Sequence, residues 1–317
     1  MTDTGSDLRA GAARALGPGG SPARILWRRF LDHRLAVASL AVLVVLAAAS
    51  FAAPLVDAWT PLSPTRVDLM ARNAAPSLAH PLGTDELGRD VLLRLLYGGR
   101  VSLTVGFAAA LISALIGTAI GLVAGYYGGR FDALLMRVTD GVIALPLLPL
   151  LIVLAAIDFT KLGVPEAVMS GEQASLYRIV GLVAIVGWTT VARLVRGAVL
   201  SLKTREFVLA AQALGAGNGR VMAVHLLPNV ASPIIVATTL SIGNIILLES
   251  VLSFLGLGIQ PPMASWGNML TNAQELIYSN PMLAVWPGLL IFLTVIAFNF
   301  LGDGLQDALD PRSGLQR

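Results

Sequence analysis

The sequence contains no cysteine, and only 13% of its 317 residues are charged. Without cysteine there is no disulfide framework, no thiol catalysis and no cysteine-based metal site. Soluble domains carry about a quarter charged residues, so the low charge and the 56% hydrophobic content predict a polytopic membrane protein. The net charge of +3 is explained by arginines that flank membrane helices. We therefore expect membrane lipid as a partner, and no nucleic acid, because little polar surface remains to bind it.

Six apolar runs are each long enough to cross a hydrocarbon layer of about 30 Å. They cover approximately residues 35–53, 101–126, 135–157, 178–195, 233–257 and 282–301. The predicted fold class is an all-α polytopic membrane protein with six transmembrane helices. Pro146 and Pro149 lie inside the third run and must break or kink it. Gly117, Gly121 and Gly125 recur four residues apart in the second run, so one of its faces should admit a neighbouring helix closely.

The basic residues gather on one side of these runs. By the positive-inside rule, both termini and the segment around Ala210 are predicted to be cytoplasmic. The chain then divides into four parts: a flexible tail at 1–23, a segment at 24–100 with the first span and a long outer loop, a membrane core at 101–302 that includes an inner loop at 200–229, and an inner C-terminal tail at 303–317.

The outer loop ends in a cluster of titratable residues, His80, Asp85, Glu86 and Asp90. Their spacing fits neither a zinc pair nor an EF-hand loop, so we expect no metal there. A turn followed by a helix capped by Thr84 is favoured instead. Leucines at 92, 93, 95 and 96 then predict an amphipathic element lying at the membrane surface.

The inner loop at 200–229 predicts two short helices. Thr204 can cap the first, which is apolar at positions 207, 208, 211 and 214, and Gly215 can supply a left-handed stop. The second is predicted over 218–226, because Pro228 disfavours helix in the residue before it. Helices this short cannot span a bilayer. Their apolar face either packs beneath its own bundle or docks on another cytoplasmic protein, and periodicity alone favours neither.

Glu249 is the one acid near the middle of a predicted span. An intramembrane carboxylate is costly, so it is a candidate for a pore-facing position. A structural role as partner to a neighbouring hydroxyl or backbone group carries equal weight. Asn244 is a second possible pore-facing residue, although interhelical hydrogen bonds are the favoured role for both Asn244 and Asn299.

The inner loop also carries a recognisable spacing: Ala210-Ala211, three residues, Gly215, nine residues, and then His225-Leu-Leu-Pro228. This pattern resembles the "EAA" loop of bacterial binding-protein-dependent ABC importer permeases. Segments at 80–90, 252–262 with 266–269, and 298–311 are similar to the second, or C-type, permease subunit of dipeptide, oligopeptide and nickel importers. The resemblance covers residues 26–312, nearly the whole chain.

The resemblance implies a type I ABC importer permease fold in the bacterial inner membrane, with a cytoplasmic coupling helix. It implies as partners a homologous second permease, two ATPase subunits and a periplasmic binding protein that delivers short peptides. Nickel complexes, glutathione or another small solute are alternative cargoes, and an ion-coupled secondary transporter is a remote alternative. The implied ATPase-docking loop comprises Glu206, Leu209, Ala210, Ala211, Gly215, Leu227 and Pro228.

No catalytic residue is expected in this chain. Its two lysines, Lys161 and Lys203, lie outside any glycine-rich phosphate loop, so ATP and Mg should be bound by the partner ATPases and no cofactor by this subunit. The loop departs from the family pattern, which has Glu and Arg where this chain has Leu209 and Gln212. Glu206, one turn earlier and on roughly the same helix face, is a candidate to replace the missing acid.

Overall fold

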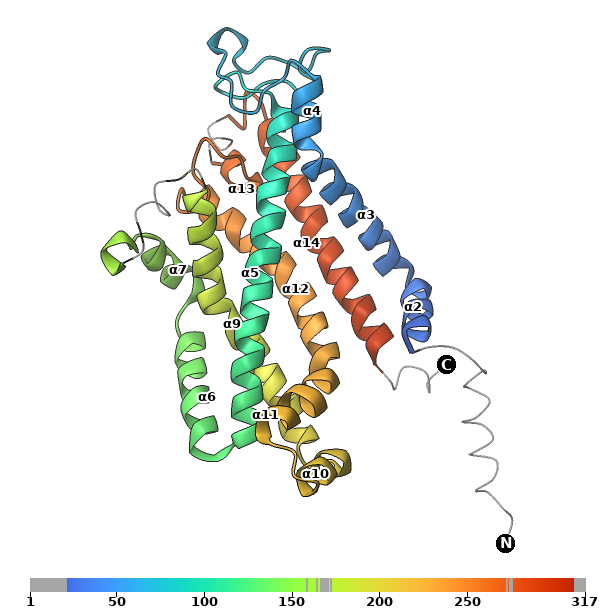
Figure 1. The fold of residues 1–317 in the computed structure, drawn as a ribbon. Helices are drawn as coiled ribbons and strands as arrows, with labels where there is room; N and C mark the ends of the chain where they lie inside the picture. Colours follow the sequence, from blue (N-terminus) through green and yellow to red (C-terminus); the bar gives the residue numbers. More distant parts are fainter. Residues whose placement is uncertain are drawn as a thin grey trace.

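The computed structural model describes residues 22–157, 159–163, 165, 171, 173–271, 273 and 276–310. Nearly all of the tail predicted at 1–23, and the final residues 311–317, lie outside this part of the chain. Five helical segments are long and apolar enough to cross a membrane (Figure 1). Four of them are single helices: α3 (Arg34–Phe51), α5 (Val91–Tyr127), α9 (Ala174–Leu202) and α14 (Met282–Leu309). The other is a continuous helical run made of α11 (Asn218–Arg220), η3 (Val221–Leu226) and α12 (Leu227–Phe254).

The sixth predicted span is a broken helix. It consists of α6 (Gly129–Ala144) and α7 (Leu147–Ala155), which meet at an angle of 88°. The break falls at Leu145 and Pro146, as the proline predicts. Pro149 adds no second kink because it lies in the first turn of α7, where a backbone N–H would have no partner within the helix. With this pair counted as one span, the all-α fold with six spans is confirmed.

The helices α5 and α9 pack along the predicted glycine face. A Cβ atom added at Gly117 would lie 2.5 Å from the Trp188 carbonyl oxygen, and one added at Gly121 would lie 2.6 Å from the Ala192 carbonyl oxygen. At Gly125 the nearest atom would be the Cβ of Val199, at 2.8 Å. The two backbones therefore approach so closely that only glycine fits along this stripe.

The end of the bundle that carries the titratable cluster, which was predicted to be the outer end and keeps that name below, differs from the prediction in two ways. The helix that follows the titratable cluster begins at Val91 and is capped by Asp90, whose Oδ1 accepts a hydrogen bond from the Leu93 amide at 2.9 Å, and not by Thr84. Thr84 is buried and its hydroxyl bonds the backbone of Ala71 and Ala74. The leucines at 92–96 form no separate surface element, because α5 runs unbroken from Val91 and buries several of its first side chains.

Two short elements complete this end, α4 (Ala53–Trp59) and η1 (Leu69–Ala71). A third, α13 (Trp266–Met269), packs against α5, α12 and α14. With 37 residues, α5 is about 55 Å long, more than the hydrocarbon layer of about 30 Å requires. The Trp266 indole packs against Gly99 and donates a hydrogen bond to the Leu95 carbonyl at 2.9 Å.

The inner loop continues directly into the fifth span. Pro228 was expected to end a short helix, but it lies in the first turn of α12, after the π-helical turn η3. In this wider turn the Leu227 amide bonds the Met222 carbonyl, five residues back. A π turn accommodates Pro228, which has no N–H to donate and whose ring crowds a normal helical turn.

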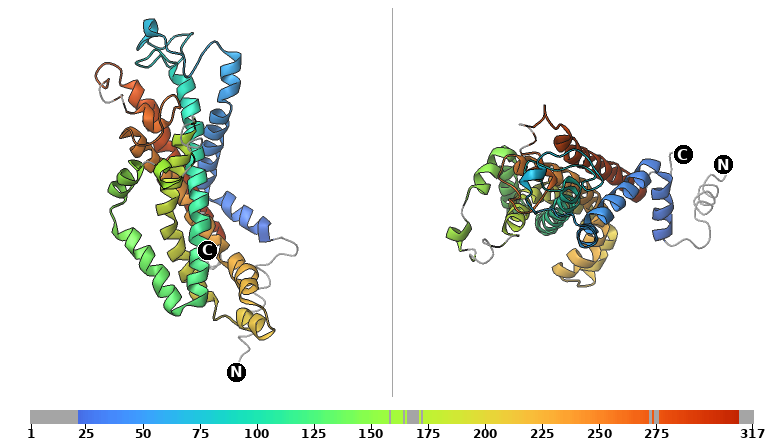
Figure 2. Two further views of the ribbon diagram at one scale, coloured as in Figure 1. Left: turned by 60° about the vertical axis from the view of Figure 1, so that its left-hand side comes forward. Right: turned by 90° about the horizontal axis from the view of Figure 1, so that it is seen from above.

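The end of the bundle that carries this loop was predicted to be the inner end and keeps that name below. It also contains α2 (Pro22–Asp32), which lies across the bundle axis (Figure 2), and the last turns of α14. Phe30 of α2 packs in a small cluster with Ala36 and Ala308. The tail expected from residue 303 is therefore helical as far as Leu309. Both α2 and the end of α14 lie toward the end of the bundle that carries α10 (Glu206–Ala213), opposite α4 and α13.

Candidate functional site

The predicted docking helix is present as α10, and its start differs from the expectation. Arg205, not Thr204, occupies the N-cap position, and no side chain caps the helix there. The Thr204 hydroxyl instead donates to the Ser201 carbonyl at 3.4 Å. Glu206 occupies the first turn, where its negative charge is favourable at the positive end of the helix dipole.

The end of α10 follows the prediction. Gly215 has a φ of +84°, the left-handed conformation that favours glycine. Its amide bonds the Gln212 carbonyl at 2.9 Å, and the Ala216 amide bonds the Ala211 carbonyl at 3.0 Å. This pair of bonds is a Schellman motif, which ends the helix and turns the chain toward α11.

The apolar residues of α10 divide between a buried face and an exposed face. Val208 is fully buried in a cluster formed mainly by valines of α9, η3 and α12. Phe207, Leu209 and Leu214 remain exposed, at 43%, 51% and 89% of their surface. One side chain therefore packs the helix against its own bundle, while three leave an exposed apolar surface, and docking of another protein on that surface stays a prediction.

Polar contacts at the inner end of α5 fix the position of α10 further. The Gln212 amide donates to the Tyr126 hydroxyl at 3.3 Å, and that hydroxyl donates to Asn218 Oδ1 at 2.8 Å. Lys203 Nζ donates to the Gly125 carbonyl at 2.8 Å. The Gln212 bond therefore connects α10 to α5, and the Lys203 bond connects the end of α9 to α5. Sequence reasoning missed Tyr126, because its contacts come from residues more than 80 positions away.

The remaining residues of the predicted docking loop lie around this helix. Glu206 and Ala210 are exposed and Ala211 is half-buried on α10, while Leu227 and Pro228 are exposed at the start of α12. Glu206 lies three residues before Leu209, so both occupy neighbouring positions on the solvent side. Six of the seven predicted residues are thus exposed in or after α10 or at the start of α12, and Ala211 is half-buried.

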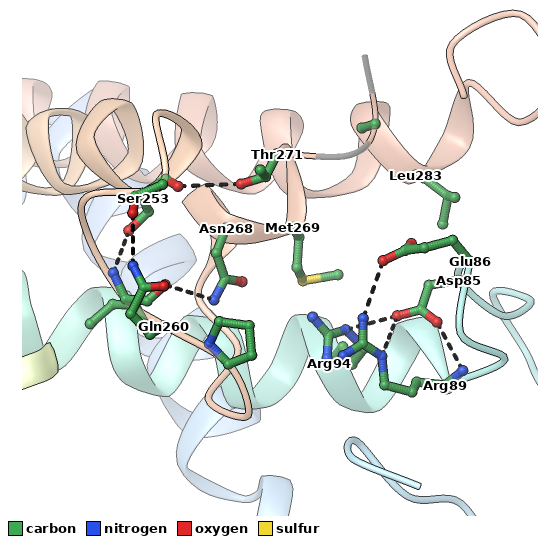
Figure 3. A pocket seen from close by; sticks show the side chains of 14 residues that line it. Asp85, Glu86, Arg89, Arg94, Ser253, Gln260, Asn268, Met269, Thr271 and Leu283 are labelled. Atoms are coloured by element: carbon green, nitrogen blue, oxygen red, sulfur yellow. Dashed lines mark hydrogen bonds and ion pairs between the residues drawn. The ribbon is translucent and has the colours of Figure 1, made fainter. Parts of the chain in front are cut away.

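The titratable cluster at the outer end forms ion pairs (Figure 3). Asp85 Oδ2 lies 2.7 Å from Arg89 Nε and 3.2 Å from Arg94 Nε, and Asp85 Oδ1 accepts hydrogen bonds from the backbone amides of Leu87 and Arg89. His80 Nδ1 lies 3.0 Å from Asp90 Oδ2. The four predicted residues therefore order the loop before α5. The ion pairs of Asp85 with Arg89 and Arg94 line a cavity of about 250 Å³, which Gln260 and Asn268 also border.

Glu249 is fully buried and does not face an open cavity. Its Oε2 accepts a hydrogen bond from Ser102 at 3.0 Å and its Oε1 one from Ser253 at 2.6 Å. Each serine oxygen also accepts a backbone amide, Ser102 from Trp266 at 3.2 Å and Ser253 from Ile259 at 3.0 Å. This geometry supports the structural alternative, because the carboxylate joins α5 and α12 to the outer segment at 255–269.

Asn244 lies on the opposite side of α12 and is exposed. It borders a cavity of about 580 Å³ between the α6–α7 break, α9 and α12. Asn299 is exposed on α14 and does not line this cavity. Thr190 of α9, which sequence reasoning did not single out, borders the cavity together with Asn244. A threonine within an apolar run gives no sequence signal of what it faces.

These features define a class: a multi-span helical membrane protein with a short exposed helix at one end of the bundle. Residues 117–314 match the family described as the binding-protein-dependent transport system inner membrane component, and residues 21–76 match the N-terminal transmembrane domain of oligopeptide transport permease C. The chain belongs to the family of binding-protein-dependent transport system inner membrane components.

Curated relatives agree along most of the chain. It is 43% identical to the dipeptide transport system permease protein DppC of Bacillus subtilis, over 90% of this chain and 84% of that protein. It is 42% identical to the glutathione transport system permease protein GsiD of Pectobacterium atrosepticum, over 92% of each chain. It is 36% identical to the oligopeptide transport system permease protein OppC of Bacillus subtilis, over 90% of each.

The family confirms that this chain is the permease subunit of a multi-component transport system and a multi-pass protein of the inner membrane. The resemblance drawn from the four sequence motifs is thereby confirmed, and so is a role in transport rather than catalysis.

Proposed function

We propose that this chain forms, with a homologous permease, the membrane path of an ATP-driven importer for short peptides delivered by a periplasmic binding protein. The peptide cargo is supported by relatives named for dipeptide and oligopeptide transport at 43% and 36% identity. Glutathione, itself a short peptide, is a second candidate because a relative named for its transport is 42% identical.

The observation that carries the mechanism is α10. It presents Phe207, Leu209 and Leu214 outward, while buried Val208 and the Gln212–Tyr126 hydrogen bond hold it against the bundle. A separate ATPase subunit that binds this surface would move α10, and α5 and α9 with it. In this proposal two ATPase subunits hold ATP and Mg, and this chain holds no cofactor.

Glu206 has a defined part in the proposal. Its exposed carboxylate lies one turn before Leu209, and Leu209 occupies the position at which the family loop has an acid. We assign it the polar contact to the ATPase that Leu209 cannot make. We also propose that both chain termini and α10 lie in the cytoplasm. The basic residues near α2 and α10 support this, and so does the position of these two helices toward one end of the bundle (Figure 1).

The test uses the complete complex in proteoliposomes, with peptide uptake and binding-protein-stimulated ATP hydrolysis measured together. Alanine at Gly215 (φ +84°) must adopt a conformation that costs about 1–2 kcal/mol, so Gly215→Ala should reduce uptake per ATP hydrolysed. Gly219→Ala in the same loop is the matched control, because its φ is not positive and no atom lies within 4 Å of the added Cβ. Equal coupling in the two variants would contradict the role given to α10.

Glu206→Ala and Glu206→Gln test the substituted acid. Both should weaken ATPase association and make the remaining association less sensitive to salt, because the contact they remove is electrostatic. Unchanged association would show that docking depends on the apolar surface alone. Separately, a wild-type complex that hydrolyses ATP but takes up no di-, tri- or tetrapeptide, glutathione included, would refute the peptide cargo without touching the coupling role.

A further inference from the structure

The cavity of about 580 Å³ between the α6–α7 break, α9 and α12 has a size typical of sites for small ligands. Its walls are mostly apolar, with four polar side chains, Thr189 and Thr190 from α9 and Ser241 and Asn244 from α12. These positions come from the central parts of two spans, so the polar groups lie at membrane depth.

Two of the four polar side chains satisfy their own helix. The Ser241 hydroxyl donates to the Ala237 carbonyl at 2.7 Å, and the Thr189 hydroxyl donates to the Val186 carbonyl at 3.3 Å. Asn244 and Thr190 are exposed, and neither makes a side-chain hydrogen bond to another residue in the described part of the chain. A polar group in hydrocarbon without a partner costs several kcal/mol. Both side chains therefore need water or a ligand in the cavity.

The backbone beside the cavity also indicates water. Leu145 and Leu147, on either side of the 88° break at Pro146, border the same cavity. Non-helical backbone at membrane depth occurs where protein covers it or where it lines a water-filled space. Broken helices in transporters also border the sites where solutes bind.

The described side chains that line the cavity are polar or apolar, and none of them is charged. Glu249, five positions after Asn244, turns to the opposite side of α12, where Ser102 and Ser253 enclose it. The cavity therefore offers an amide and a hydroxyl but no charge that would select for or against an ionised side chain.

We propose that this cavity is the wall that this subunit contributes to the path, and that Asn244 and Thr190 bind the backbone amides and carbonyls of the passing peptide. Such groups occur in every peptide, so these contacts are independent of side-chain charge. The proposal rests on the proposed function and adds to it the residues that contact cargo and the chemistry they recognise.

The first experiment uses the absence of cysteine from the sequence. Asn244→Cys and Thr190→Cys are made singly in the complete complex in proteoliposomes, and this chain is assayed for labelling by a membrane-impermeant thiol reagent. Both cysteines should be labelled, and transported dipeptide with binding protein and ATP should slow the labelling severalfold. Phe292→Cys on α14 is the matched control. Phe292 lies near the middle of its span and is 59% exposed but does not line the cavity, so this cysteine should stay unlabelled.

The second experiment places a charge in the path. Asn244→Asp should favour uptake of Ala-Lys over Ala-Asp by about three- to tenfold relative to wild type, and Asn244→Lys should reverse the preference, as expected for charges several ångströms apart in a partly hydrated path. Asn299→Asp should leave the ratio unchanged. Because ratios are compared within each variant, a lower amount of assembled complex does not affect the result.

Three results would overturn the proposal. The first is no labelling at Asn244→Cys and Thr190→Cys, which would mean that a helix of the partner fills the cavity. The second is equal labelling at Phe292→Cys, and the third is the same uptake ratio in wild type and both charged Asn244 variants. None of these would refute peptide import itself, which is read from uptake by the wild-type complex.

Discussion

Replacing Glu249 tests whether the buried carboxylate holds the outer segment to the bundle. In Glu249→Ala, the hydroxyls of Ser102 and Ser253 lose their shared acceptor, which lies 3.0 Å and 2.6 Å away. An unsatisfied buried donor costs about 1–3 kcal/mol, so the two together predict a loss of about 2–6 kcal/mol. Glu249→Gln keeps one acceptor oxygen and nearly the same shape, and should lose less.

The assay is the thermal midpoint of the purified complex in detergent, followed by the loss of soluble, assembled complex on heating. A free-energy loss of 1 kcal/mol lowers the midpoint by about 2–4 °C in domains of 150–250 residues, so a fall of about 5 °C or more is expected for Glu249→Ala. Ser250→Ala is the matched control. Its buried hydroxyl bonds only the Ile246 carbonyl of its own helix, at 2.8 Å, so it should lose about 1 kcal/mol at most.

The opposite outcome is physically possible, which makes the experiment decisive. Burying a carboxylate is itself costly, and an apolar replacement can be neutral or stabilising where the polar contacts do not repay that cost. If Glu249→Ala is no less stable than Ser250→Ala, the hydrogen bonds to the two serines do not hold the outer segment, and the reasoning is wrong.

Two further predictions concern packing and the outer cluster. Gly121→Leu should separate α5 from α9 and prevent stable assembly, because the added Cβ alone would lie 2.6 Å from the Ala192 carbonyl oxygen. Gly197→Ala on α9 should be tolerated, because no atom lies within 4 Å of the added Cβ. Similar yields of purified complex for both variants would contradict close packing of the two helices. Asp85→Asn should cost about 3–5 kcal/mol, because buried Arg94 loses its counter-ion. Limited proteolysis of the outer loop measures this loss of stability. Glu86→Gln is the control and should have the smaller effect, because Glu86 is at a more exposed position.

Features that depend on neighbours in the sequence were predicted well. The apolar runs marked the spans, Pro146 marked the break, and the spacing of Gly117, Gly121 and Gly125 marked the face that contacts α9. Gly215 marked the end of α10. In each case the physical cause lies within a few residues: hydrophobic length, a missing amide hydrogen, a missing Cβ or a positive φ.

The errors arose where two signals of similar strength competed locally. Thr84 and Asp90 can both cap a helix, and the Thr84 hydroxyl is used by the backbone of the outer loop, which leaves Asp90 as the cap. Pro228 can end one helix or begin another, and the wide turn of η3 permits the second. No local pattern distinguishes these outcomes, because the residues that decide them come from elsewhere in the fold or from the geometry of a single turn.

The sequence by itself determined that this is a multi-span membrane subunit of a transport system and which loop is its candidate contact with a motor, because hydropathy and motif spacing are properties of the chain. Only the tertiary structure decided the roles of Glu249 and Asn244. The two residues lie five positions apart on α12, but Ser102 of α5 encloses the acid, whereas the α6–α7 break leaves the amide exposed to a cavity. What a polar side chain in a membrane span does depends on what faces it across the bundle, and that is set by helix packing.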